Sequence, residues 1–190
     1  MKYRQLGRTG LKVSEVSFGC WAIGGSGYGV TRDDESLEAL ETAFRHGVNF
    51  FDTADTYGHG HSEELLSQFI QGKPRGEFLI ASKAGWDFYH GGSKKNFDPE
   101  YIRFACEKSL SRLSVDAIDV YQLHNPSLEL IKNGESIRVL ENLKKEGKIR
   151  FIGISVHSEE EALEAMADGR VDTLQVAFNI SDHEKFWNWN

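Results

Sequence analysis

Short apolar runs alternate with longer amphipathic stretches along most of the chain. The apolar runs are rich in β-branched and aromatic residues and lie at residues 16–18, 48–51, 78–81, 117–121, 149–152 and 173–176. Most of them are continuous rather than strictly alternating, which is typical of strands that are covered on both faces of a sheet. The pattern therefore predicts six buried strands.

An amphipathic helix is predicted after most of these strands. The apolar stripes lie at residues 37–44, 65–70, 102–113, 137–143 and 162–166. Asp98 and Pro99 have the residue types of a helix start, and Ser158 with Glu161 forms a capping box. The order is thus a strand and a helix repeated about six times, at roughly 30 residues per unit, which predicts an α/β protein with a parallel sheet.

Two parallel architectures compete, an open doubly wound sheet and a (β/α)₈ barrel. A doubly wound dinucleotide-binding protein should carry a Gly-x-Gly-x-x-Gly turn after its first strand and an acidic residue about 20 positions later. Glycines follow the first strand at residues 24–27, but no acidic residue stands at the expected strand end. We interpret them as a flexible loop. Residues 3–14 read as a hairpin that precedes the repeat and would plug the bottom of a barrel.

Length and composition exclude several classes of protein. The chain has 190 residues and a net charge of −7, so residues 1–190 are expected to form one domain that does not bind nucleic acid through phosphate contacts. No apolar run approaches the roughly 18 residues of a membrane span, and the N-terminus does not read as a signal peptide. Two distant cysteines favour a reducing, cytoplasmic compartment.

Polar side chains stand where the predicted strands end. The second strand is followed by Asp52 and Tyr57, the third ends at Lys83, and the fourth ends at His124. In a barrel these ends meet at the carboxyl-terminal face, where active sites lie. A Lys⁺ lowers the pKa of a nearby tyrosine, an aspartate keeps the lysine charged, and a neutral histidine donates a hydrogen bond. The set suits proton transfer to a carbonyl oxygen.

The chain resembles the aldo-keto reductases over residues 1 to about 180. The motifs that carry the resemblance are residues 4–14 (RQLGRTGLKVS), 51–58 (FDTADTYG) leading to 62–64 (SEE), 81–83 (ASK), 122–126 (QLHNP) and 147–155 (GKIRFIGIS). The resemblance implies a TIM barrel and the reduction of aldehydes or ketones with NADP(H), with NAD(H) as the alternative cofactor. The expected partner is a small-molecule carbonyl substrate.

The resemblance also implies a role for each site residue. Tyr57 would be the general acid, Lys83 and Asp52 its tuning pair, and His124 the orienting donor. Two further positions, Ser155 and Gln175, match those that hold the nicotinamide carboxamide, and the expected substrate pocket contains Trp21, Trp86 and Asn125.

The chain departs from the family pattern in three ways. Many members carry Asn after the serine at position 155, whereas this chain has Val156. Six units are fewer than the eight of a closed barrel, so we expect a C-terminally shortened member whose open sheet edges favour self-association. Residues 181–190 read as an atypical tail. The alternative function is therefore a catalytically weak or inactive interaction module.

A metal site is not expected. His59 and His61 form a His-x-His pair in a glycine loop, but no further ligand stands at a fixed spacing from them.

Overall fold

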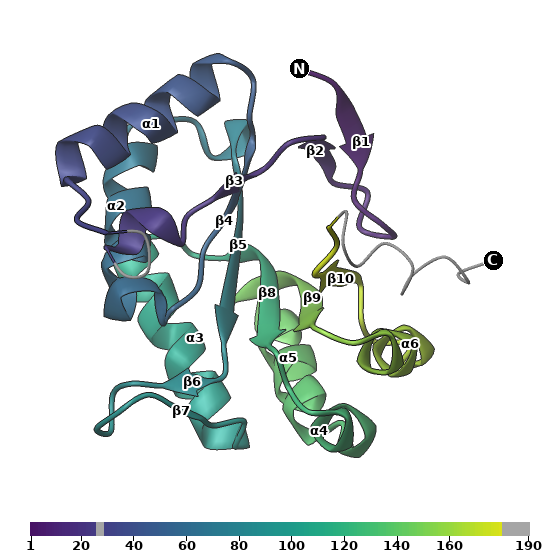
Figure 1. Ribbon diagram of the computed structural model, residues 1–190. Coiled ribbons are helices and arrows are strands. Elements are labelled where there is room, and N and C mark those ends of the chain that lie inside the picture. The colour runs from purple at the N-terminus through teal and green to yellow at the C-terminus, as the bar shows by residue number, and fades with distance from the viewer. Residues whose placement is uncertain (26–28, 180–190) are drawn as a thin grey trace.

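Six parallel strands form one curved sheet in the computed structural model, which describes residues 1–25 and 29–179. Its order is β10-β9-β8-β5-β4-β3. The strands are β3 (Phe18–Gly19), β4 (Phe50–Asp52), β5 (Leu79–Ala84), β8 (Ile118–His124), β9 (Ile149–Val156) and β10 (Thr173–Val176). Every pairing between neighbours is parallel. The sheet is of the TIM-barrel type, with the six strands that the sequence predicts (Figure 1).

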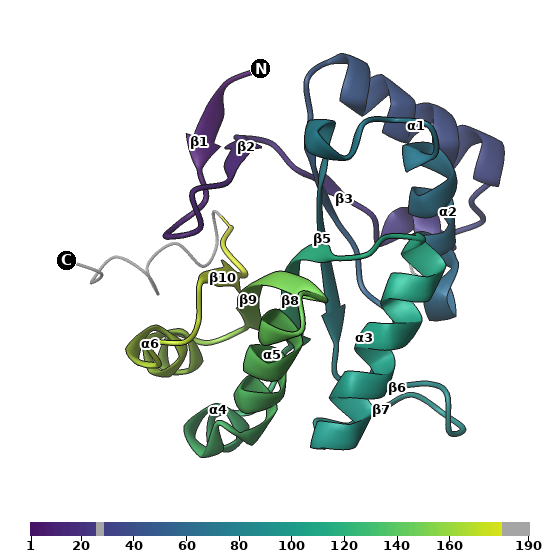
Figure 2. The same cartoon turned by 180° about the vertical axis from the view of Figure 1, so that it is seen from behind.

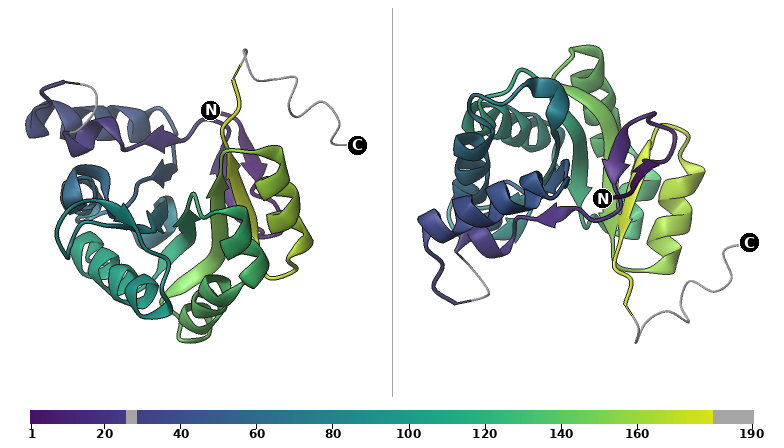
Figure 3. Two further views of the ribbon diagram at one scale, coloured as in Figure 1. Left: turned by 60° about the horizontal axis from the view of Figure 1, so that its bottom comes forward. Right: turned by 90° about the horizontal axis from the view of Figure 1, so that it is seen from above.

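Helices cover the convex face of this sheet (Figures 1 and 3). They are α1 (Asp33–Arg45), α2 (His61–Ile70), α3 (Pro99–Leu113), α5 (Glu135–Lys145) and α6 (Glu159–Ala167). Helix α3 begins with Pro99 after Asp98, and Ser158 with Glu161 makes the predicted capping box of α6. Each helix lies between consecutive parallel strands, as the predicted order requires.

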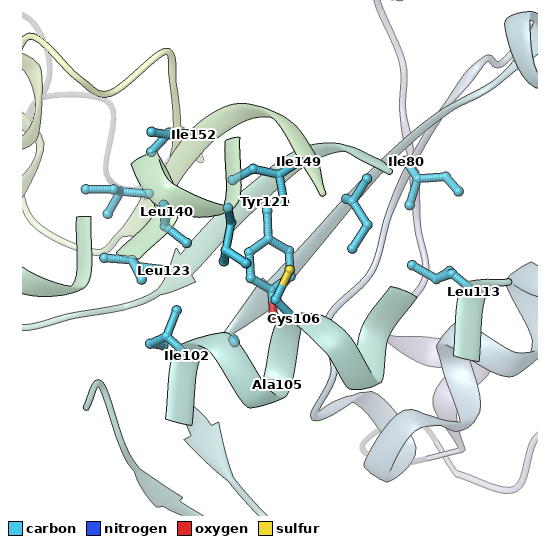
Figure 4. Packing of buried hydrophobic residues seen from close by; sticks show 14 of the residues in the cluster. Ile80, Ile102, Ala105, Cys106, Leu113, Tyr121, Leu123, Leu140, Ile149 and Ile152 are labelled. Atoms are coloured by element: carbon cyan, nitrogen blue, oxygen red, sulfur yellow. The ribbon is translucent and has the colours of Figure 1, made fainter. Parts of the chain in front are cut away.

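The core between helices and sheet centres on β8 and α3. Tyr121 is fully buried among Ile102, Cys106 and Ile149 (Figure 4). Leu140 of α5 extends the same cluster. Side chains of β8 that point outward, such as Tyr121, are buried by α3 and α5. Burial of this face removes the need for polar residues on it, as is typical of a strand inside a parallel sheet.

An N-terminal hairpin covers the other face of the sheet at the end where the strands begin. Strand β1 (Tyr3–Gln5) pairs antiparallel with β2 (Lys12–Ser14). Leu11 and Val13 pack there against Leu79 and Val120, which point to the concave side of the sheet. The predicted hairpin and its position under the strands are confirmed, and Figure 2 shows it from behind.

The structure contains several short elements that the sequence pattern did not predict. The chain forms short 3-10 helices η1 (Ala22–Gly24), η2 (Tyr57–Gly60) and η3 (Arg75–Glu77), a small antiparallel pair β6 (Trp86–Asp87) with β7 (Lys94–Lys95), and helix α4 (Leu128–Asn133). The expected flexible loop is wrong at Gly24, which is buried in η1. Residues 26–28 and the predicted tail at 181–190 lie outside the described residues.

Removing a core side chain should cost far more stability than removing an exposed one. We expect Leu140→Ala to lower the free energy of unfolding by about 2–5 kcal/mol, because it leaves a cavity beneath α5. Leu163→Ala on α6 is the matched control, since Leu163 is half exposed, and its effect should stay within about 0.5 kcal/mol. Urea unfolding followed by circular dichroism measures both. Equal losses would contradict the position of the core.

Candidate active site

The polar residues predicted at the strand ends converge at one edge of the sheet. Asp52 ends β4, Lys83 lies near the end of β5, and His124 ends β8. The register places His124 beside Ser155 of β9, and Ser155 beside Gln175 of β10. Because parallel strands all end at the same edge, side chains far apart in the sequence become neighbours there.

The buried ammonium of Lys83 is the centre of this site. The residue is 2% exposed. Its Nζ donates to Asp52 Oδ1 at 2.5 Å, to the Thr53 carbonyl oxygen at 2.8 Å and to Tyr57 Oη at 3.3 Å. A charge removed from water needs such partners to offset the loss of hydration. Three of the four residues predicted for proton transfer are thus joined through one atom.

Two glycines place Tyr57 on the loop after β4. Tyr57 begins η2, and the next residue, Gly58, has φ +60°. A Cβ on Gly58 would collide with the carbonyl oxygen of Gly24, and a Cβ on Gly24 would lie 2.8 Å from the carbonyl carbon of Tyr57. Only glycine fits at this close backbone contact. The contact holds the tyrosine loop against η1.

His124 completes the set from the neighbouring strand. Its ring meets that of Tyr57 edge-on, with centroids 5.8 Å apart. Burial lowers the pKa of His124 to about 3, and the positive charges of Lys83, His157 and Lys95 act in the same direction. The imidazole is therefore neutral at physiological pH, as the sequence analysis expects. A neutral imidazole carries one N–H and can donate one hydrogen bond.

The net pKa of Tyr57 differs from the sequence-based expectation. Lys83 acts to lower it, as expected, but burial is the larger influence and the pKa of Tyr57 is raised, with Asp52 adding to the rise. Burial also pulls the pKa of Lys83 down, yet Asp52 and Tyr57 together outweigh it and the pKa rises. The site at neutral pH therefore holds a protonated phenol beside a charged ammonium.

Gln122 belongs to the site but was missed by the sequence analysis. It is buried on β8, and its Nε2 donates to Asp52 Oδ2 at 3.3 Å and to Gln175 Oε1 at 3.4 Å. Gln175 donates in turn to Asp52 Oδ1 at 3.4 Å. The two-residue period of a strand was the available signal, since Gln122 precedes His124 by two positions and shares its face.

The residues expected in the substrate pocket lie around this centre at different distances. Trp21 is 48% exposed, and its ring centroid lies 6.4 Å from that of Tyr57. Trp86 is on β6, where Lys95 Nζ lies 5.7 Å from its ring centroid. The same Nζ donates to the Asn125 carbonyl oxygen at 2.8 Å, so it ties the β6–β7 hairpin to the end of β8.

The two histidines of the glycine loop point to different partners. His59 stacks on Phe88 with centroids 5.0 Å apart, whereas His61 pairs with Asp33 at 2.8 Å. Within residues 1–25 and 29–179, no group of three or more His, Cys, Asp or Glu side chains is arranged to hold a metal ion. No helix in the same part of the chain is long and apolar enough to cross a membrane.

A second polar cluster lies between the sheet and the helices, behind the site. Arg112 of α3 pairs with buried Glu63 of α2 at 2.7 Å, and Ser82 Oγ donates to Glu63 at 2.6 Å. Asp55 is fully buried, and in the described part of the chain neither of its carboxylate oxygens has a hydrogen-bond partner. Burial, reinforced by Glu63, raises the pKa of Asp55 well above its usual value. The sequence analysis did not single out Asp55.

Comparison with known proteins places the chain in a defined context. The model of the "Aldo/keto reductase family" matches residues 15–186. The chain is 36% identical to "Uncharacterized oxidoreductase YqkF" of Bacillus subtilis over 184 residues, which cover 96% of this chain and 58% of the relative. It is 34% identical to "NADH-specific methylglyoxal reductase" of Escherichia coli, covering 96% and 60%.

Solved structures give the same match. The holo form of "aldo-keto reductase AKR11C1" from Bacillus halodurans superposes with a TM-score of 0.83 at 32% identity, covering 94% of this chain and 58% of that one. The chain thus spans somewhat more than half the length of these relatives.

Replacing Asp55 by asparagine should change how stability depends on pH. A carboxyl group whose pKa is raised on folding contributes stability below its unfolded pKa, near 4, and loses that contribution as pH rises through the folded pKa. Asp55→Asn mimics the neutral form and lacks this loss. We therefore expect the stability of the variant to rise, relative to the parent chain, from pH 4 to pH 8.

Urea unfolding at several pH values measures this difference. Asp116→Asn is the matched control, because Asp116 is exposed, and its difference from the parent should stay flat. A flat difference for Asp55→Asn as well would show that the carboxyl group is ionised in the folded chain.

Proposed function

Because this chain belongs to the aldo/keto reductase family, we propose that its strand-end site reduces the carbonyl group of an aldehyde or a ketone to an alcohol. The observation that carries the proposal is the buried Lys83 ammonium, which joins Asp52 to the hydroxyl group of Tyr57. Trp21 lies beside the same phenol, with the two ring centroids 6.4 Å apart. The residues to which the proposal assigns the proton transfer, Asp52, Tyr57, Lys83 and His124, all lie in the described part of this chain.

The expected cofactor is NADP(H), with NAD(H) as the alternative. When bound, the reduced nicotinamide supplies the hydride that reaches the carbonyl carbon. The fit rests on Ser155 and Gln175, which stand side by side in register at the ends of β9 and β10. A hydroxyl and an amide at that position suit the hydrogen-bonding groups of a primary amide such as the nicotinamide carboxamide.

Tyr57 is the proposed proton donor to the carbonyl oxygen. Its raised pKa keeps the phenol protonated at neutral pH, so a proton is available when negative charge develops on the substrate oxygen. The resulting phenolate forms 3.3 Å from Lys83 Nζ, whose positive charge stabilises it. Asp52, held by Lys83 and Gln122, keeps that ammonium charged and in place.

His124 is the proposed second donor to the same oxygen. Its neutral state, with a pKa of about 3, means that it positions the carbonyl by a hydrogen bond instead of competing as an acid. Trp21 and Trp86 remain the proposed pocket residues, and Asn125, the third residue expected there, follows β8 beside Ser155. The buried, unpaired thiols of Cys20 and Cys106 support a reducing, cytoplasmic location.

Removing the Tyr57 hydroxyl group should abolish turnover without abolishing cofactor binding. We expect Tyr57→Phe to lower kcat for carbonyl reduction by about 10²–10⁴-fold, since a positioned acid contributes that much. Tyr3→Phe is the matched control, because the Tyr3 hydroxyl bonds to the Gly47 carbonyl oxygen far from the site. NAD(P)H oxidation followed at 340 nm measures turnover, and nicotinamide fluorescence measures binding.

The outcomes separate the two functions considered from the sequence. If the parent chain reduces the carbonyl substrate and the Tyr57→Phe variant does so at a similar rate, Tyr57 is not the general acid. Cofactor binding without turnover by the parent chain would favour the alternative, a catalytically inactive interaction module.

We also propose that the chain associates with a second copy through the β10 edge. In the described residues β10 pairs only with β9, so one row of its backbone groups faces outward. Apolar side chains of α6 lie near this edge: Met166 lines a surface hollow with Thr173 and Leu174 of β10, and Met166 and Leu163 are both about half exposed. A two-fold pairing of β10 with β10 would cover both features.

Light scattering coupled to size exclusion should detect this dimer. We expect a molar mass that rises with protein concentration, and a smaller dimer fraction when Leu163 and Met166 are both replaced by lysine. A monomer at every concentration would contradict the proposed self-association.

A further inference from the structure

The backbone of Asn125 is fixed at the end of β8. Its N–H donates to the carbonyl oxygen of Ser155 at 3.1 Å and lies 3.2 Å from Ser155 Oγ, while its own carbonyl oxygen accepts from Lys95 Nζ. The residue has φ +56°, a left-handed conformation that asparagine tolerates better than most side chains. The chain therefore turns sharply here and holds the side chain in one place.

Ser155 also orients the side-chain amide of Asn125. Ser155 Oγ donates to Asn125 Oδ1 at 3.0 Å. Among the residues that the structure describes, Asn125 Nδ2 has no hydrogen-bond partner. Because Oδ1 is occupied and the side chain is only half buried, the amide presents a free pair of N–H donors beside the Ser155 hydroxyl.

The side chain of Val156 does not reach the strand-end site, so the amide of Asn125 is the one that lies beside Ser155. The resemblance to the family leads us to expect asparagine at the position after the serine, and this chain has Val156 there. Val156 is 2% exposed and belongs to the apolar cluster between sheet and helices. It therefore points away from the strand-end site. Asn125 brings an amide to Ser155 from the neighbouring strand instead.

We infer that Asn125 binds the carboxamide of the nicotinamide cofactor, donating from Nδ2 to the carboxamide oxygen, rather than lining the substrate pocket. This inference rests on the proposed function, because it requires a nicotinamide dinucleotide in the strand-end site. Ser155 connects the two amide side chains of this site: its hydroxyl group bonds to Asn125, and its backbone stands in register with that of Gln175. The amide lost at position 156 is thereby replaced from the end of β8.

Asn125→Gly is the sharpest test, because glycine adopts a positive φ without strain and removes only the amide. We expect its affinity for NADPH and NADH to fall about fivefold, the effect of one ordinary hydrogen bond. Affinity for 2′-phospho-ADP-ribose, which lacks the nicotinamide ring, should not change. Nicotinamide fluorescence and isothermal titration calorimetry, carried to millimolar ligand, measure these affinities.

Two further variants separate the amide donor from general damage. Asn125→Asp keeps an acceptor for Ser155 Oγ but has no N–H, so it should lose affinity for the dinucleotides as well. Asn133→Gly, at an exposed asparagine on α4, is the matched control and should bind as the parent does. Circular dichroism confirms that each variant is folded.

The possible failures are distinguishable. If the parent chain binds neither dinucleotide, the proposed function fails and this inference fails with it. If the parent binds and both Asn125 variants bind equally well, only the inference is overturned. An equal loss of affinity for 2′-phospho-ADP-ribose would also overturn it, because the effect would then not depend on the nicotinamide ring.

Discussion

A lysine ammonium buried inside the sheet constrains the arrangement of the surrounding strands. Lys83 can remain charged there only because Asp52, the Thr53 carbonyl oxygen and Tyr57 Oη surround its Nζ. These partners come from β4 and the loop that follows it, whereas Lys83 comes from β5. A shift of β5 by one residue would turn Lys83 to the opposite face, and a shift of β4 would turn Asp52 away, so either shift would break the ion pair. The ion pair and the strand register therefore depend on each other.

Alternation along the strands separates chemistry from packing. Lys83 points to the concave side and meets Asp52, while its neighbour Ser82 points outward to Glu63 beneath the helices. The two nearby aspartates differ in the same way. Asp52 is bonded to a cation, whereas Asp55 is buried without a partner and has a raised pKa. One short segment thus supplies a charged carboxylate to the site and a carboxyl group that favours its neutral form to the helix layer.

The order of elements was predictable because it depends on local patterns. Apolar runs and amphipathic stripes gave the six strands, the main helices and the N-terminal hairpin, and strand ends pointed to Lys83 and His124. Contacts that depend on register or close packing were not predictable in this way. The bonds of Gln122 require β4, β8 and β10 to be aligned, and the burial of Gly24 requires the backbone of Gly58 to approach it. The net pKa of Tyr57 needed three-dimensional burial as well.

The same limit explains how a local departure in sequence can be compensated elsewhere. Val156 stands where the resemblance to the family leads us to expect asparagine. In three dimensions the valine fills the core, and Asn125, which follows the neighbouring strand β8, places its amide against Ser155. A hydrogen-bonding group at a strand-end site can be supplied by any neighbouring strand whose register brings it to the same level. Site chemistry in this fold is therefore a property of the whole sheet edge, and a motif on a single strand describes only part of it.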